Sequence, residues 1–307
     1  MSSNRLKTGD RKQLSDRPRQ TKAVIDLWKV RLHNFLNLLN RDCTLHQKPG
    51  GALSTKGKVS RLQGNRMAVS IFFDEYNNQT AGLEAIRGDA ESIRMVLEDE
   101  QKFRYKFPSE DNPKLFEPLQ FENQGRLVAT FKTFLEKWKT TQPPGTIVDS
   151  FLLYVHGHGA QVLGQQCLMT KKWTAIPIME LVNLVVKHVP SNRYYVVMDC
   201  CSNKKLADEK AIKRVAEAMD VEKPHNFKDK FVLVNAAPEG FTASAERGKT
   251  LSSALVRVLD ESLKRGGNGV PLRDLENRLR EEQVKQGSTN FPTVVAPPTL
   301  MDELFPL

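Results

Sequence analysis

The stretch FLLYVHGHGAQV, residues 151–162, places two of the six histidines of this 307-residue chain on either side of one glycine. His156 and His158 come at the end of an apolar run of strand length without polar alternation, which is typical of a strand buried on both faces. A second run of this kind, RYYVVMDC over residues 193–200, leads into a pair of adjacent cysteines. Two predicted strands therefore end in chemically reactive side chains.

Strands and helices alternate along residues 67–297. Apolar runs predict strands over 67–73, 103–107, 150–157, 193–200, 231–237 and 290–297, and apolar spacing of three and four residues predicts helices over 82–100, 125–138, 176–189, 252–266 and 271–287. Pro292 indicates that the last strand lies at an edge. This pattern predicts a three-layer α/β fold, in which a mainly parallel sheet has helices on both faces.

In parallel sheets of this kind, reactive groups gather at the carboxyl ends of the strands. The two histidines and the cysteines Cys200 and Cys201 are therefore expected at the same edge of the sheet, although about forty residues separate them. One interpretation is nucleophilic catalysis, in which an imidazole activates a cysteine thiol and a neighbouring glycine offers its N–H to an oxyanion.

Two other interpretations of these residues compete with catalysis. His156 and His158 could ligate zinc, although the chain has no CxxC pair and adjacent cysteines are poorly placed to share one ion. The residues could also be structural, with buried cysteines and with histidines whose ring nitrogens bond to backbone groups.

Residues 1–66 form a basic extension. They hold 15 Lys and Arg against 4 Asp and Glu, whereas the remaining residues hold 31 and 32. We expect a disordered leader over 1–20, one amphipathic helix over 21–39 and a flexible linker over 48–58. The extension is either a solvated leader or an electrostatic contact for an acidic partner, such as nucleic acid, an acidic lipid surface or an acidic protein.

The composition favours a reducing compartment. Four cysteines in a chain of this length do not indicate a disulfide scaffold. No apolar run approaches the roughly 20 residues that span a bilayer. The first twenty residues have no apolar stretch of the kind found in secretory signals, so we expect none. We expect a cytoplasmic protein, with the nucleus as the other compartment that fits.

The motifs resemble those of the caspase/metacaspase group of cysteine peptidases, which has the caspase-haemoglobinase fold, and are most similar to metacaspases. YVHGHGAQ is similar to the metacaspase strand that ends in Tyr-Ser-Gly-His-Gly-x-Gln, and YYVVMDCC to the strand that ends in Asp-Ser-Cys or Asp-Cys-Cys. GDAESIRMVL, AAPEGFTASAERGKTLSSALVRVL and QGSTNFPTVVAP resemble further family segments, in the family's order.

The resemblance covers about residues 67–297 and implies a caspase-like peptidase domain over 67–307. Within it, residues 67–203 resemble a large subunit, 204–230 a linker and 231–307 a small subunit. Residues 204–230 are either a surface helix with a loop or a linker that the enzyme cleaves itself after Lys or Arg.

The resemblance also implies a catalytic dyad. His158 matches the family's base and Cys201 its nucleophile, and the oxyanion would be bound by the backbone N–H groups of Gly159 and Cys201. His156 stands where the family usually has serine and is expected to line the substrate pocket near its mouth. Cys200 is expected to pack. The resemblance implies no third catalytic residue beside His158 and Cys201.

Asp89 and Asp199 match family positions that line an acidic substrate pocket. The resemblance therefore implies cleavage after Arg or Lys, because a buried cation needs carboxylate partners. Each aspartate has a structural alternative, since Asp89 can cap its helix and Asp199 a following turn. MDCCSNKK is unlike the Gln-Ala-Cys-Arg-Gly motif of caspases, which cleave after Asp.

The chain departs from the family in two places. Ser202-Asn203-Lys204 replaces the usual His-Ser-Gly after the cysteine, and residues 162–173 lack the acidic side chains of calcium-dependent metacaspases. We therefore expect no metal site and no cofactor. The predicted function is that of a cysteine endopeptidase acting on polypeptides. The alternative is a catalytically weak or inactive relative that serves as an interaction scaffold or regulator.

Overall fold

The structure, a computed structural model, describes residues 65–73, 76, 84–99, 103–107, 124–162, 165–201, 230–237, 243–244, 246–288 and 290–306. Nearly all of the basic extension lies outside the described residues, including the helix predicted over 21–39 and the linker predicted over 48–58. The segment predicted as a surface helix or cleavable linker, 204–230, also lies outside them except for its last residue.

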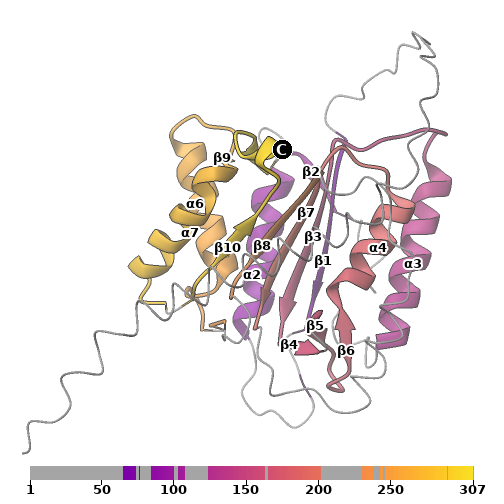
Figure 1. The fold of residues 1–307 in the computed structure, drawn as a ribbon, viewed down its shortest axis with the longest axis horizontal. Coiled ribbons are helices and arrows are strands. Elements are labelled where there is room, and N and C mark those ends of the chain that lie inside the picture. The colour runs from indigo at the N-terminus through magenta and orange to yellow at the C-terminus, as the bar shows by residue number, and fades with distance from the viewer. Residues whose placement is uncertain are drawn as a thin grey trace, which may run out of the picture. The chain divides into compact units, whose positions relative to one another are not determined.

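Within the described residues, six strands form the central sheet, in the order β10-β8-β7-β3-β1-β2 (Figure 1). Their bounds are Arg66–Phe72 for β1, Tyr105–Lys106 for β2, Ser150–Gly157 for β3, Tyr194–Cys200 for β7, Phe231–Asn235 for β8 and Thr293–Val295 for β10. All neighbours are parallel except β10, which runs antiparallel to β8 at one end of the sheet. The predictions of a mainly parallel sheet and of an edge position for the last strand are confirmed.

Helices cover both faces of this sheet (Figure 1). Helices α2 (Glu84–Glu98), α6 (Leu251–Lys264) and α7 (Leu272–Lys285) lie on one face, and α3 (Gln124–Thr141) and α4 (Ile178–His188) lie on the other. Every residue of β7 is buried, and so is every residue of β3 except its last. Since neither face of the sheet meets water, the two strands need no polar alternation, and their sequences show none.

The helices form where the apolar spacing predicts them, and their ends differ from the predicted ones by at most three residues. In α2 the residues Ile86, Ala90, Ile93 and Leu97 recur at steps of three and four and are all buried. They join one apolar core with side chains of the central strands and of α6 and α7. The burial of one helical face therefore fixes α2 against the sheet.

A small antiparallel sheet follows β3 and was not predicted. It consists of β4 (Gly159–Val162), β5 (Gln165–Met169) and β6 (Ala175–Pro177), in that order. In the sequence, residues 162–173 stand out only by their lack of acidic side chains. Their strands are short, and the apolar half of β5 is buried against the domain, so the segment carries neither a long apolar run nor clear alternation.

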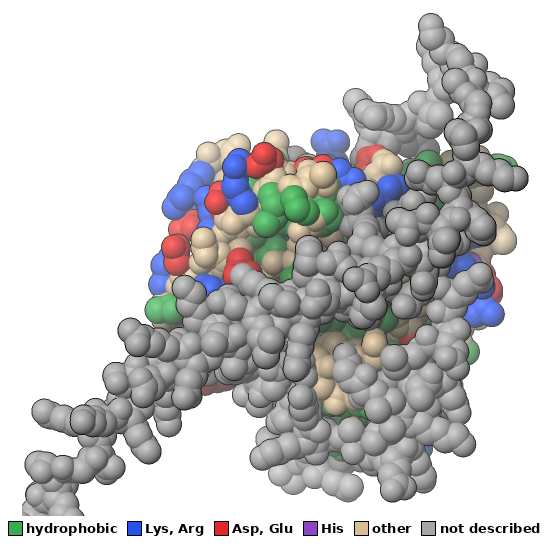
Figure 2. Space-filling model, in the orientation of Figure 1, with side chains coloured by type: hydrophobic (Ala, Val, Ile, Leu, Met, Phe, Trp, Pro, Cys, Tyr) green, Lys and Arg blue, Asp and Glu red, His purple; other side chains and the backbone are tan. Residues whose placement is uncertain are grey.

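The C-terminal segment closes the domain beside the start of β7. Strand β9 (Val270–Pro271) pairs antiparallel with β11 (Leu304–Phe305), after the short 3-10 helix η5 (Pro298–Leu300). The guanidinium of Arg193 donates two hydrogen bonds to the carboxylate of Glu303. Basic and acidic side chains are interspersed over α6 and α7 (Figure 2), as in the ion pair between Arg280 and Glu276 at 2.7 Å. Among the described residues, no helix has the length and hydropathy to cross a membrane.

Candidate active site

The end of β3 lies beside the end of β7. These parallel strands pair with Gly157 opposite Cys200, so the next residue along each strand, His158 and Cys201, leaves the sheet at the same edge. The histidine and cysteine motifs therefore meet at one edge of the sheet, as expected from the sequence.

Two glycines allow this close approach. A Cβ atom on Gly159 would lie 2.1 Å from the carbonyl oxygen of Cys201 and 3.0 Å from the Sγ atom of Cys200. Gly157 has a φ of +147°, and a Cβ atom there would lie 2.6 Å from the hydroxyl oxygen of Tyr76. Any other residue at either position would force neighbouring groups to move, so both glycines are required by the local packing.

The imidazole ring of His158 lies against two aromatic rings. Tyr76 meets it edge-on at 4.4 Å between centroids, and Trp173 stacks on it at 5.2 Å with 29° between the planes. The backbone N–H of His158 donates to the hydroxyl oxygen of Tyr76 at 2.7 Å. Burial lowers the pKa of the His158 ring, which is therefore neutral at neutral pH and able to accept a proton.

Cys200 and Cys201 differ in their surroundings. The Cys200 side chain is 1% exposed, and burial strongly raises the pKa of its thiol. Cys201 is partly exposed, and the backbone N–H of Ala243 donates to its Sγ atom at 3.3 Å. Burial raises the pKa of the Cys201 thiol, and this N–H opposes the effect because it favours the thiolate. Gln166 fixes the turn by donating to the Cys201 carbonyl oxygen at 2.7 Å.

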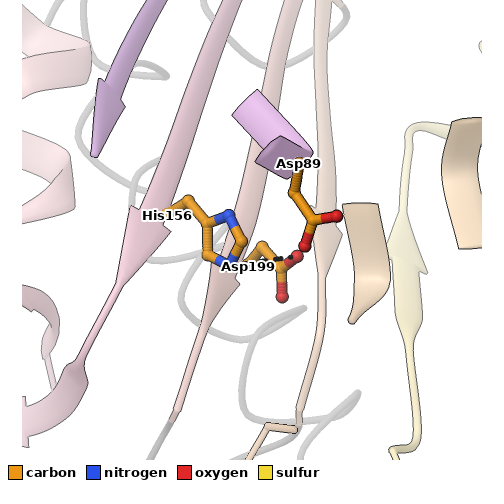
Figure 3. A group of neighbouring side chains, drawn as sticks. All are labelled: Asp89, His156 and Asp199. Carbon is orange, nitrogen blue, oxygen red and sulfur yellow. Dashed lines mark ion pairs between the residues drawn. The ribbon is translucent and has the colours of Figure 1, made fainter. Parts of the chain in front are cut away.

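Asp89, His156 and Asp199 form a buried cluster on the α2 side of the same strand ends. Figure 3 shows the three side chains pointing toward one another, Asp89 from α2 and the other two from β3 and β7. His156 lies directly opposite Asp199 in the strand register, and its Nε2 atom is 3.5 Å from Asp199 Oδ2. One ligand atom from each residue lies within 4.8 Å of the others. We expected His156 near a pocket mouth, but its side chain is buried, with 2% of its surface exposed.

The start of α6 supplies hydrogen bonds to both aspartates. Ser252 donates to Asp199 Oδ2 from its backbone N–H at 2.8 Å and from its hydroxyl at 2.5 Å. Asp89 accepts from the hydroxyls of Thr250 at 2.6 Å and Ser253 at 2.9 Å. Both carboxylates thus face the N-terminus of a helix, where the backbone dipoles favour negative charge. The alternative in which Asp89 caps its own helix does not hold, because Asp89 lies within α2 and accepts from the start of α6. The turn that Asp199 could cap lies outside the described residues.

Asp89 and Asp199 are both buried, and each has a feature that bears on the binding of a cation. Burial raises the pKa of Asp89, and the hydroxyl of Thr250 and the charge of His156 oppose this shift. Asp199 Oδ1 is buried and has no hydrogen-bond partner among the described residues. One carboxylate oxygen in the cluster therefore retains full capacity to accept from a cationic group.

Sequence reasoning missed several residues of these two clusters. Tyr76 and Trp173 contact His158, Gln166 holds the Cys201 turn, and Thr250 and Ser252 bond to the aspartates. For the last two a signal existed, because Thr-Leu-Ser-Ser before an apolar helical run is a typical N-cap sequence. No local pattern marks the other three, which reach the site through tertiary packing.

A family model described as the caspase domain (Peptidase_C14) matches residues 65–299. The chain belongs to the caspase-domain family. The resemblance noted in the sequence is thereby confirmed at the level of this family, and the alternating sheet and helices are its caspase-like fold.

Two solved structures resemble this caspase domain at low sequence identity. Protein GSU0716 from Geobacter sulfurreducens is 13% identical with a TM-score of 0.47, and the match covers 78% of this chain and 97% of that one. Caspase-1 from Spodoptera frugiperda is 11% identical with a TM-score of 0.45, covering 81% and 94%. A search of curated proteins finds no match.

Proposed function

We propose that this protein is a metacaspase-like cysteine endopeptidase that cleaves polypeptides after Arg or Lys. Cys201 is the nucleophile and His158 is the general base and acid. The observation that carries the proposal is the strand pairing of Gly157 with Cys200, because it delivers His158 and Cys201 to the same edge of the sheet on adjacent strands. The caspase-domain family supplies the class of chemistry.

The pKa shifts define how the dyad begins its reaction. Burial lowers the pKa of His158 and raises that of Cys201, so the free enzyme holds a neutral imidazole and a neutral thiol. The thiol proton therefore moves to His158 as Sγ attacks the substrate carbonyl carbon, instead of moving in advance. The N–H of Ala243, 3.3 Å from Sγ, stabilises the sulfur as it gains negative charge.

The remaining steps follow from this proton transfer. The tetrahedral oxyanion accepts hydrogen bonds from the backbone N–H groups of Gly159 and Cys201. His158 then gives its proton to the leaving amine nitrogen, the C–N bond breaks and a thioester remains on Cys201. Water, deprotonated by His158, attacks this thioester and releases the acid and the thiol.

Specificity for a basic residue rests on Asp89 and Asp199. The two carboxylates share one buried cluster, and Asp199 Oδ1 accepts no hydrogen bond from the described part of the chain. A guanidinium or ammonium group at this position would supply the missing donor and neutralise buried negative charge. His156 lies in the same cluster, so it limits the space and the charge available to the substrate side chain.

Active-site labelling tests the proposal directly. The full-length protein is treated with a thiol-reactive acyl-Arg peptide probe and with the matching acyl-Asp probe. We expect the Arg probe to label one site, which is lost in Cys201→Ala and in His158→Ala but retained in Cys200→Ser. Labelling that survives Cys201→Ala would refute the dyad. No labelling of the folded protein by either probe would favour the scaffold alternative.

A further inference from the structure

A chain of hydrogen bonds fixes the proton positions around His156. Ser252 Oγ lies 2.5 Å from Asp199 Oδ2 and 2.6 Å from the hydroxyl oxygen of Tyr154, which lies 2.7 Å from His156 Nδ1. The hydroxyl of Ser252 donates its only hydrogen to Asp199 Oδ2. The hydroxyl hydrogen of Tyr154 must then point to Ser252.

These hydrogen positions determine which nitrogen of the His156 imidazole carries a hydrogen. The hydroxyl of Tyr154 is buried and has a single hydrogen to donate. Because that hydrogen is used on Ser252, the Tyr154 oxygen accepts from His156, and Nδ1 carries a hydrogen. The other nitrogen, Nε2, faces Asp199 Oδ2 at 3.5 Å. Of the two ring nitrogens, Nε2 is therefore the one that can ligate a cation, and beside it the buried Asp199 Oδ1 accepts no hydrogen bond from the described residues.

We propose that Asp89, His156 and Asp199 bind a divalent transition-metal ion of the zinc class through Nε2 of His156 and one oxygen of each carboxylate. One imidazole nitrogen and two carboxylate oxygens are ligands that zinc accepts. The two carboxylates, when ionised, balance the double charge of such an ion.

The geometry requires little movement. In tetrahedral zinc sites the ligand bonds are about 2.0–2.2 Å long, which puts two N or O ligand atoms about 3.3 Å apart. The distance between His156 Nε2 and Asp199 Oδ2 is 3.5 Å, and the three ligand atoms lie within 4.8 Å of one another. Asp89 would approach through a change of its side-chain torsions, and water would complete the coordination.

The groups around the cluster act as supports for the three ligands. Tyr154 orients the His156 ring through Nδ1, and Ser252, Thr250 and Ser253 hold the two carboxylates. Hydrogen bonds of this kind fix the tautomer and orientation of metal ligands. Calcium and magnesium fit less well, because both prefer six or more oxygen ligands and a histidine nitrogen occupies one position here.

A bound ion would also affect the proposed peptidase. The metal and the cation of an Arg or Lys side chain would compete for Asp89 and Asp199, so zinc would inhibit cleavage after basic residues. This consequence rests on the proposed function, whereas the metal site itself does not. The test is therefore a binding measurement on protein whose nucleophile has been removed.

Zinc binding is measured by titrating Zn²⁺, buffered by a competing chelator, into the full-length Cys201→Ala protein. We expect one zinc ion whose affinity falls roughly 100-fold or more when His156→Ser or Asp89→Asn is added, and about 10–100-fold when Tyr154→Phe is added. Adding His158→Ala should leave the affinity unchanged, because His158 lies in the other cluster. Circular dichroism establishes that each variant is folded, and Asp89→Asn keeps the shape of the side chain.

Three outcomes would overturn the metal site. The first is the absence of zinc binding by the Cys201→Ala protein. The second is an affinity that neither His156→Ser nor Asp89→Asn changes. The third is loss of the zinc ion upon His158→Ala, which would place it at the catalytic histidine. Absence of peptidase activity in the unmodified protein would refute the proposed function and leave this binding result intact.

Discussion

The indole ring of Trp173 stacks on the imidazole ring of His158, with 5.2 Å between centroids and 29° between planes. Trp173 has a φ of +58°, in the left-handed region that bulky residues rarely occupy. A conformation of this kind costs energy and persists only where the surrounding structure imposes it. Here it turns the indole toward the proposed base, so the strained turn positions His158.

We predict that Trp173→Leu lowers kcat by up to about 100-fold and changes KM little, because it loosens a ring that must meet the thiol and the leaving group. It also exposes His158, whose pKa should rise toward its ordinary value. Since His158 acts as a base when neutral, the acidic limb of the pH profile of kcat/KM should move to higher pH. Kinetics with an Arg peptide over a pH series measure both effects, and Trp138→Leu on α3 is the matched control. An unmoved acidic limb would contradict this role.

Gly159→Ala should destabilise the domain and abolish labelling of Cys201. The added methyl group would lie 2.1 Å from the Cys201 carbonyl oxygen, so the two strand ends must separate. Overpacking of this kind costs about 1–3 kcal/mol of unfolding free energy. Gly88→Ala is the control, because no atom lies within 4 Å of a Cβ there and the residue is in a helix. That control should gain about 0.5–1 kcal/mol. Denaturant unfolding measures both variants, and equal stabilities would show that the strand ends separate freely.

The sequence predicted the sheet and its helices because one-dimensional patterns govern them. Strands β3 and β7 are apolar throughout since helices cover both faces, and α2 repeats its apolar residues at the helical period. The same patterns predicted that His158 and Cys201 lie at one edge of the sheet, because the carboxyl ends of neighbouring parallel strands lie at the same edge. The antiparallel strands β4, β5 and β6 escaped prediction because they are too short to establish a period.

The candidate site was predictable only where its residues stand in motifs. Asp89 and Asp199 were singled out by family resemblance, but their contacts with Thr250 and Ser252 depend on how α6 meets α2 and β7. The environment of His156 could not be predicted either. Its burial, and the hydrogen bond between its ring and the Tyr154 hydroxyl, follow from side-chain packing that no local pattern records.

Peptidase activity should survive removal of divalent metal ions. The predicted dyad needs no ion, and the segment 162–173 contains no acidic side chain that would bind calcium. Hydrolysis of an Arg peptide is measured before and after treatment with EDTA, and again after calcium is added. We expect an unchanged rate, or a higher one where EDTA removes inhibitory zinc. A large loss that calcium restores would show that a calcium site exists.

Asp89→Asn should stabilise the protein near neutral pH. Burial raises the pKa of Asp89, so the folded state favours the protonated carboxyl. The favourable contribution is complete below the pKa of the unfolded chain and is lost as the pH rises through the folded value. At neutral pH the ionised carboxylate therefore opposes folding, and the neutral amide removes this cost while still bonding to Thr250. Thermal unfolding between pH 4 and pH 8 provides the measurement, roughly spanning the ordinary aspartate pKa and neutrality. A variant less stable than the parent at pH 7 would indicate that its lost charge was stabilising.

The preference for a basic residue before the cleaved bond depends most on Asp199. If its carboxylate pairs with a buried guanidinium, removing one partner costs about 3–5 kcal/mol. Asp199→Ala should therefore lower kcat/KM for Arg substrates by roughly two orders of magnitude or more. Because Asp199 also accepts from Ser252 at the start of α6, Ser252→Ala serves as the matched control for damage to that helix end. It should lower kcat/KM much less than Asp199→Ala.

Profiling with peptides that vary only in the residue before the cleaved bond should give Arg and Lys as preferred and Asp as rejected, since a substrate carboxylate would meet like charge. A preference for Asp or for an apolar residue would refute the acidic pocket and leave the dyad of His158 and Cys201 unaffected.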